Sequence, residues 1–310
     1  MIEIAGVNKS FNGSRVVADL DLTVAEGELA VLVGTSGSGK STTLKMLNRL
    51  IEPDSGSIRV AGRDIRSQPP EILRRHIGYA IQSVGLFPHW TVAQNVAAVP
   101  QLLKWPPARI RARVEELLDA LRLPAREFGH RYPHQLSGGQ QQRVGVARAL
   151  AADPDVLLMD EPFGALDPVT RANLQQELAR IQRLFGKTVI LVTHDIDEAL
   201  LLGQRIVVMD QGRIVQQGGA RDILLRPAND FVRQFFNPAD VGVRLLGLVR
   251  VEERMRPGER ADGAAIRADS TLREALSAFV AQGAAVLPVE DGQGARLGAL
   301  RFDDLLGPRA

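Results

Sequence analysis

The sequence predicts an α/β fold, with a largely parallel sheet covered by helices on both faces. Two continuous apolar runs, at residues 29–33 and 156–159, are typical of strands buried on both faces. Segments with helical spacing alternate with these and other strands, and this alternation favours parallel pairing through crossover helices. A glycine-rich loop and then a helix follow the first run, which is the order of a phosphate-binding βα unit.

Composition limits the class of protein. The chain has 310 residues, which suggests about two domains, and 45% of them are hydrophobic but only 5% aromatic. The net charge is +2 with no dense basic run, so we do not expect nucleic-acid binding. The absence of cysteine excludes disulfides and thiolate chemistry. The N-terminus resembles a short strand rather than a signal peptide, and no apolar run approaches membrane-spanning length, so we expect a soluble chain that reaches a membrane only through partner subunits.

The glycine-rich loop carries the clearest chemistry. Its glycines let the backbone approach phosphate oxygens, and its N–H groups and the following helix point positive charge at them. Lys40 supplies a cation for the β- and γ-phosphates, and the Ser41 hydroxyl suits Mg²⁺. The alternative is a flexible turn, which the strand before and the helix after disfavour. The loop fits G-x-x-x-x-G-K-[ST] with Gly34, Thr35, Ser36, Gly37, Ser38, Gly39, Lys40 and Ser41.

Before and after this loop the chain alternates strands, turns and helices. Residues 2–7 and 16–24 read as strands joined by a turn that contains Phe11. A helix near 70–75 leads to a strand at 77–81 that ends at Gln82. Residues 91–152 show no strand pattern. Thr91 is a plausible cap for a helix at 92–98, and helices at 108–121 and 140–151 follow. This stretch predicts a helical insertion in the α/β body.

Polar side chains follow the next two strands. Asp160 and Glu161 come directly after the run at 156–159, and His194 follows a strand at 187–192. Open α/β sheets place their ligands at the carboxyl ends of strands, so we expect these groups near the phosphate loop. Asp160 suits Mg²⁺ through its water shell and Glu161 can orient a water. Taken alone, the acidic pair could be a solvated turn, and Gln82 and His194 could be surface residues.

The remaining chain divides in two. A helix at 169–185 precedes the strand at 187–192, and a hairpin at 205–217 and short helices at 220–225 and 230–236 close the first domain. Residues 237–240 look like a junction. Residues 241–310 form a small α+β unit with an expected helix at 271–282, strands at 285–289 and 296–300, and a helix start at 303–306.

A second glycine motif identifies the family. Residues 136–140, Leu-Ser-Gly-Gly-Gln, join a hydroxyl, glycine N–H groups and a helix start, which makes a second anion site. Alone the motif reads as a helix cap. With the phosphate loop, Gln82, residues 156–161, residues 165–167 and His194 in the same order, it resembles the signature of ATP-binding-cassette (ABC) ATPases. The resemblance covers about residues 1–236, and it implies a P-loop NTPase fold with a helical subdomain at about 91–152.

The resemblance implies roles for these residues. Phe11 would stack on adenine, Lys40 and the amides of residues 37–42, Thr42 included, would hold phosphates, and Ser41, Gln82 and Asp160 would serve Mg²⁺. Glu161 would be the catalytic base and His194 would contact the γ-phosphate. Asp167 would lie at the subunit seam. Ser137 and Gly139 would contact ATP bound to the opposite copy, so that a homodimer encloses two nucleotides.

The family resemblance also implies partners and a solute. Family ATPases of this type pair with integral membrane permease subunits on the cytoplasmic face of the inner (plasma) membrane, and an extracytoplasmic solute-binding protein acts indirectly. Residues 81–106 look like those of importers for osmoprotectant quaternary amines such as glycine betaine, choline and carnitine. Another solute, or a soluble non-transport ABC ATPase, is the alternative. Residues 271–306 resemble one cystathionine-β-synthase-type (CBS) repeat, which implies either a regulatory or a dimerisation element.

Overall fold

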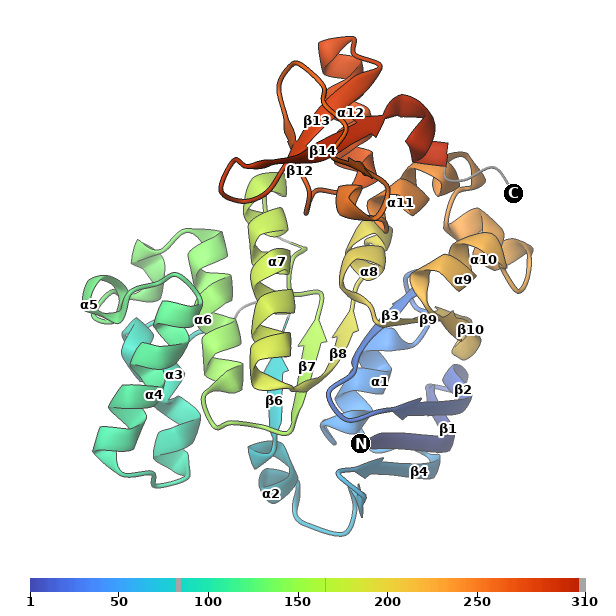
Figure 1. Cartoon of the computed structure of the whole chain (residues 1–310). Coiled ribbons are helices and arrows are strands. Elements are labelled where there is room, and N and C mark those ends of the chain that lie inside the picture. The colour runs from blue at the N-terminus through green and yellow to red at the C-terminus, as the bar shows by residue number, and fades with distance from the viewer. Residues whose placement is uncertain (82–84, 165, 307–310) are drawn as a thin grey trace. The chain divides into compact units, whose positions relative to one another are not determined.

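The computed structural model describes residues 1–81, 85–164 and 166–306. Contacts divide the chain into two compact units, Met1–Gly219 and Ala220–Ala310 (Figure 1). The sequence assigned residues 1–236 and 241–310 to the two domains, and that assignment stays a prediction. None of the described helices is both long and apolar enough to cross a bilayer.

A six-stranded sheet organises the first unit. Its strand order is β10-β9-β3-β8-β7-β6, and all neighbours are parallel except β9 and β10. The predicted parallel sheet is thereby confirmed. Its strands are β3 (Leu29–Gly34), β6 (Ile77–Ala80), β7 (Val156–Asp160), β8 (Thr188–Val192), β9 (Arg205–Asp210) and β10 (Arg213–Gly218).

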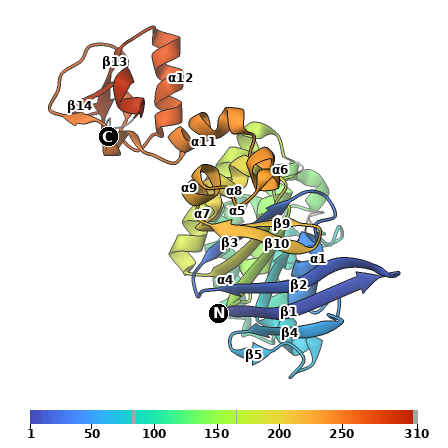
Figure 2. The same ribbon diagram turned by 90° about the vertical axis from the view of Figure 1, so that its right-hand side faces the viewer.

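A second, antiparallel sheet is built from the N-terminal strands, in the order β2-β1-β4-β5. The sequence predicted strands at 2–7 and 16–24 but not this separate layer, which Figure 2 shows beside the parallel sheet. Its inward side chains share one core with α1 (Lys40–Leu47) and with one face of the parallel sheet. The strands are β1 (Ile2–Phe11), β2 (Ser14–Val24), β4 (Ser55–Val60) and β5 (Arg63–Asp64).

Helices cover the other face of the parallel sheet. Side chains alternate between faces along a strand, so Val31 points away from the core that α1 shares with Ala30 and Leu32. There it meets α8 (Ile196–Leu202), since a Cβ on Gly203 at the end of α8 would lie 3.2 Å from Val31 Cγ2. The sequence did not predict α8. The long helix α7 (Pro168–Phe185) lies on the same side (Figure 1).

The segment between β6 and β7 is helical, with the capping that the sequence indicated. Thr91 caps α3 by accepting a hydrogen bond from the Gln94 amide, while the Gln94 side chain accepts from the Thr91 amide. The apolar stripe of α4 is buried at Val114, Leu117 and Leu118. The helices are α3 (Val92–Leu102), α4 (Pro107–Ala120), α5 (Ala125–Phe128), the 3₁₀ turn η1 (Pro133–Gln135) and α6 (Gly138–Leu150).

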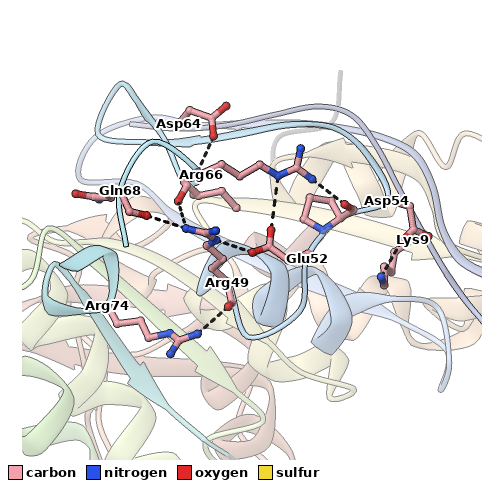
Figure 3. A network of polar contacts seen from close by, with 10 residues as sticks. Lys9, Arg49, Glu52, Asp54, Asp64, Arg66, Gln68 and Arg74 are labelled. Atoms are coloured by element: carbon pink, nitrogen blue, oxygen red, sulfur yellow. Dashed lines mark hydrogen bonds and ion pairs between the residues drawn. The ribbon is translucent and has the colours of Figure 1, made fainter. Parts of the chain in front are cut away.

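A polar network fixes the end of α1 that lies away from the phosphate loop (Figure 3). Arg74, on α2 (Pro70–Arg75), donates to the carbonyls of Asn48 and Arg49, at 3.1 and 2.7 Å. Arg49 in turn donates to Glu52 at 2.6 Å and to the Gln68 carbonyl at 2.7 Å. Guanidinium groups at the carboxyl end of a helix complement its dipole, so α1 is held at both ends.

The second unit is a small α+β fold, as predicted. Its sheet has the order β11-β14-β13-β12, and α12 packs Leu272, Ala275 and Phe279 against Leu287 and Leu300. Its strands are β11 (Arg256–Pro257), β12 (Ile266–Arg267), β13 (Val286–Glu290) and β14 (Arg296–Arg301). Its helices are α9 (Ala220–Leu225), α10 (Asp230–Phe235), η2 (Pro238–Asp240), α11 (Val241–Gly247), η3 (Val251–Glu253), α12 (Leu272–Gln282) and η4 (Phe302–Leu306).

Candidate active site

Three adjacent strands deliver the candidate residues to one edge of the parallel sheet. β3, β8 and β7 are neighbours in that order and run in the same direction. The phosphate loop therefore leaves β3 beside His194, which follows β8, and beside Glu161, which follows β7. Parallel strands end at a common edge, so topology alone gathers groups that are more than a hundred residues apart.

The phosphate loop has the backbone that its glycines predict. Gly34, Gly37 and Gly39 have φ of 153°, 79° and 98°, a region that side chains rarely adopt. A Cβ on Gly34 would lie 2.0 Å from the Met209 carbonyl oxygen, and one on Gly39 would lie 2.7 Å from the Val16 carbonyl oxygen. Because these two glycines carry no side chain, the backbone at Met209 and Val16 can pack directly against the loop. Around Gly37 the space within 4 Å of a Cβ is open.

Lys40 is the first residue of α1, and its amine points back into the phosphate loop. Nζ donates to the carbonyls of Gly34 and Thr35, at 2.9 and 2.8 Å, and to Ser38 Oγ at 3.1 Å. The side chain is buried, and burial lowers the pKa of its amine although Glu161 and Asp160 oppose that shift. Its partners are neutral oxygens, so the cation is uncompensated at close range and suits an anionic ligand.

Ser41 and Asp160 form a pair between α1 and β7. Ser41 Oγ donates to Asp160 Oδ1 at 2.8 Å. Asp160 is buried, and that burial raises the pKa of its carboxyl, with the Ser41 hydrogen bond acting in the opposite direction. A hydroxyl beside a carboxylate is an oxygen donor set that fits Mg²⁺, which is commonly bound through one or two carboxylates together with substrate phosphates. Thr42 follows Ser41 in the first turn of α1.

Glu161 and His194 face each other across β7 and β8. Glu161 Oε2 lies 3.2 Å from His194 Nδ1, and the Glu161 amide donates to the Val192 carbonyl at 2.9 Å. Glu161 has φ of 47°, which is unusual for a residue with a side chain. Such backbone is strained and clusters at functional sites, so the bend after Asp160 supports a chemical role for this carboxylate.

Ser137 and Gly139 lie at the start of α6, outside this group. Ser137 Oγ accepts from the Gln140 amide at 3.3 Å, and the Ser137 amide donates to Gln140 Oε1 at 2.9 Å, so the serine caps the helix. Gly139 is buried, and a Cβ there would lie 2.3 Å from Thr170 Cγ2 on α7. Asp167 caps α7 by accepting from the Thr170 amide at 3.0 Å.

Two predicted nucleotide contacts, those of Phe11 and Gln82, stay predictions. Phe11 ends β1 in the antiparallel sheet with its ring exposed, and Lys9 Nζ lies 5.3 Å from the ring centroid. Gln82 lies outside the described residues, as does Ala165 in the segment before Asp167.

The sequence reasoning missed polar partners on both sides of His194. Thr193 Oγ1 donates to buried Glu198 at 2.5 Å, and Asp195 pairs with Arg171 of α7 at 3.2 Å. One signal was available: Asp195 precedes Ile196 and acidic residues, a pattern typical of a helix start, and its side chain does cap α8.

The fold and the site define a P-loop nucleoside triphosphatase. Residues 17–164 match the family described as ABC transporter. The glycine betaine uptake system ATP-binding protein YehX of Escherichia coli (strain K12) is 63% identical over 99% of each chain. The glycine betaine/carnitine/choline transport ATP-binding protein OpuCA of Bacillus subtilis (strain 168) is 48% identical over 89% of this chain and 72% of its own length.

Similar solved structures are also ATP-binding cassettes or parts of ABC transporters. The dimeric post-hydrolysis structure of the ATP-binding cassette MJ0796 with ADP and Pi has a TM-score of 0.64 and 33% identity, and it covers 71% of this chain and 99% of its own. The cbiO1 structure from Clostridium perfringens has a TM-score of 0.68 and 29% identity, over 73% of this chain and 91% of its own. The chain belongs to the ABC transporter family and is an ATPase of that family, which confirms the fold class and the enzyme class predicted from sequence.

Proposed function

We propose that this chain powers the import of osmoprotectant quaternary amines, such as glycine betaine, choline or carnitine, by hydrolysing Mg²⁺-ATP. The observation that carries the solute class is the 63% identity, over 99% of each chain, to a protein named for glycine betaine uptake. The ATPase does not itself bind the solute, so this part of the proposal rests on likeness and not on site chemistry.

The family resemblance supplies the roles of the site residues, and the geometry of the described ones supports them. Lys40 and the loop amides hold the β- and γ-phosphates, and Ser41 and Asp160 hold Mg²⁺, with Gln82 as a further ligand. The metal neutralises phosphate charge when it is bound. Glu161 orients and deprotonates the attacking water, and His194, 3.2 Å from the Glu161 carboxylate, contacts the γ-phosphate.

A second copy completes each nucleotide site. Glycine amides and a helix start at Ser137 and Gly139 suit an anion, and they belong to the helical segment rather than to the phosphate loop. We therefore assign them to ATP on the opposite copy, with Asp167 at the seam. The solved dimer of the related cassette bound to ADP and Pi supports this arrangement.

Membrane permease subunits are the second class of partner, and they place the ATPase at the cytoplasmic face of the inner (plasma) membrane. We assign the segment after Gln82 as the place where these subunits dock, and Phe87, Trp90 and Leu102 are exposed apolar side chains in it. Exposed aromatic and aliphatic side chains that gather in one segment suit an interface with another protein. An extracytoplasmic solute-binding protein completes the system indirectly.

The unit after residue 240 is assigned as a CBS-like regulatory or dimerisation element. Its own sheet and core support an independent role. A chain truncated after Asp240 should keep basal ATP hydrolysis, while its response to ionic strength or its dimerisation changes. If all hydrolysis is lost, the tail belongs to the catalytic fold.

Transport in proteoliposomes tests the solute. The chain, its membrane subunits and the binding protein are reconstituted with ATP inside, and uptake of labelled glycine betaine is measured with and without excess choline or carnitine. We expect ATP-dependent uptake that at least one of these amines competes for and that a matched Lys40→Ala complex lacks. If ATP drives the uptake of another solute and of none of these amines, the solute assignment is wrong and the ATPase assignment survives.

A further inference from the structure

A polar cluster surrounds the two residues next to His194, Thr193 and Asp195. Arg171 of α7 is its centre. Its Nη1 lies 3.2 Å from Asp195 Oδ2, its Nη2 donates to the Leu166 carbonyl at 3.2 Å, and its Nε lies 4.0 Å from Glu198 Oε1. One guanidinium thus joins the loop that precedes α7 to the turn that carries His194.

The partners of Arg171 fix the backbone on both sides of His194. The Asp195 amide donates to Thr193 Oγ1 at 3.0 Å, and Asp195 Oδ1 accepts from the Asp197 and Glu198 amides at 2.9 and 3.2 Å. The Thr193 amide donates to the Leu32 carbonyl of β3 at 3.2 Å. His194 therefore lies between two residues that several hydrogen bonds hold in place, while its own side chain is exposed and lies 3.2 Å from the Glu161 carboxylate.

Glu198 is the buried carboxylate of the cluster. Its side chain is only 4% exposed, and it accepts the Thr193 hydroxyl proton at 2.5 Å. Burial raises the pKa of its carboxyl, with Arg171 among the groups that oppose the shift. A buried carboxylate of this kind needs its partners, so displacement of the guanidinium disturbs Thr193 as well as Asp195.

Leu166, whose carbonyl Arg171 holds, directly precedes Asp167. We propose that Arg171 is a positioning residue for hydrolysis, which links the loop at Asp167 to the turn of His194 and so sets His194 against Glu161 when a second copy contacts that loop. The inference rests on the proposed function, in which Asp167 lies at the seam and His194 contacts the γ-phosphate. Arg171 itself touches neither nucleotide nor water in this assignment.

The alternative is an ion pair that only stabilises the packing of α7 on α8. The two differ in what they change: a positioning role lowers kcat and leaves ATP affinity intact, whereas a packing role lowers stability and every activity together. Charge-assisted hydrogen bonds to a carboxylate and a carbonyl are directional, and misplacing a catalytic group costs up to about 100-fold in rate.

Steady-state hydrolysis by the full chain tests the proposal. Arg171→Met should lower kcat by about 10- to 100-fold while the KM for ATP changes less than about threefold. Arg180→Met is the matched control, because Arg180 is an exposed arginine of the same helix whose guanidinium donates only to the Ala120 carbonyl in the described contacts. It should leave kcat within about twofold. Equal effects of both variants, or an unchanged kcat in Arg171→Met, would overturn the proposal.

A double-mutant cycle with His194→Ala separates positioning from packing. If Arg171 acts through His194, adding Arg171→Met to His194→Ala should lower kcat less than about twofold further. Independent, multiplicative losses would show that Arg171 does not work through His194. Asp195→Asn tests whether misfolding explains the loss of activity. This variant keeps the cap acceptor of α8 but weakens the pair with Arg171. It should lower kcat in the same way with an unchanged unfolding midpoint.

Failure of the proposed function and failure of the role of Arg171 give different results. If wild-type protein neither hydrolyses ATP nor forms an ATP-dependent dimer as Glu161→Gln, the proposed function is wrong. If both hold and ATP still drives dimerisation of Glu161→Gln/Arg171→Met, while the kcat of Arg171→Met equals that of wild type, only the role of Arg171 is wrong.

Discussion

Gly139→Ala should loosen the contact between α6 and α7, although alanine is the better helix former. A Cβ at Gly139 would lie 2.3 Å from Thr170 Cγ2, which is closer than carbon atoms approach without one of them moving. Thr170 cannot easily yield, because it is β-branched and its hydroxyl and amide both engage Asp167. The strain therefore reaches the start of α7.

The magnitude follows from a neighbouring glycine. Gly138 lies one residue earlier in α6, and nothing is within 4 Å of a Cβ placed there. Gly138→Ala should therefore show the helix-propensity gain, up to about 1 kcal/mol. Gly139→Ala gains the same but adds overpacking of about 1–3 kcal/mol. The two variants should differ by that second amount, or roughly 2–12 °C in the unfolding midpoint of the first unit, Met1–Gly219.

Calorimetric unfolding of the two variants and of Gly139→Ala/Thr170→Ser measures the difference. Serine keeps the hydroxyl that bonds Asp167 and removes the methyl that clashes, so the double variant should recover most of the lost stability. Equal midpoints for Gly138→Ala and Gly139→Ala would refute the packing argument, and so would a failure of Thr170→Ser to restore stability.

Three further predictions concern the nucleotide site. Lys40→Ala should lower kcat by about 100-fold or more, as loss of a phosphate-stabilising charge does, and near-normal turnover in a phosphate-release assay would refute its role. Glu161→Gln should hold ATP and accumulate as a dimer in light scattering, whereas a monomer at saturating ATP would contradict the dimer. Asp160→Asn should raise the ligand-free unfolding temperature at pH 7. Burial raises the pKa of Asp160 above its ordinary 3.8, so folded wild type loses stability as pH rises through that range, and the advantage of the variant should vanish below pH 3.8.

Much of the fold was predictable because its signals are local. The expected helix at 70–75 has the observed bounds of α2, and Thr91 caps α3 as predicted. The phosphate loop was predictable for the same reason, since a strand, three glycines, a lysine and a helix are contiguous. Glu161 and His194 each follow a strand of the parallel sheet, so parallel pairing was enough to predict that they lie close together.

What escaped the sequence depends on contacts between distant residues. β1 pairs with β4 across about fifty residues to form a second sheet, and alternation alone does not say which sheet a strand joins. Gly139 read as a phosphate contact, but its need for glycine also comes from Thr170 on another helix. Nothing in the sequence singled out Arg171 or Glu198, and only the fold brings them into contact with Asp195 and Thr193, the neighbours of His194.

The assembly of two copies around ATP is the central claim, and one structure tests it most directly. The full chain should be crystallised with a non-hydrolysable ATP analogue and Mg²⁺. We predict that each nucleotide lies between Lys40 and Ser41 of one copy and Ser137 and Gly139 of the other. A nucleotide that contacts a single copy, with Ser137 of the second copy remote from any phosphate, would contradict the account.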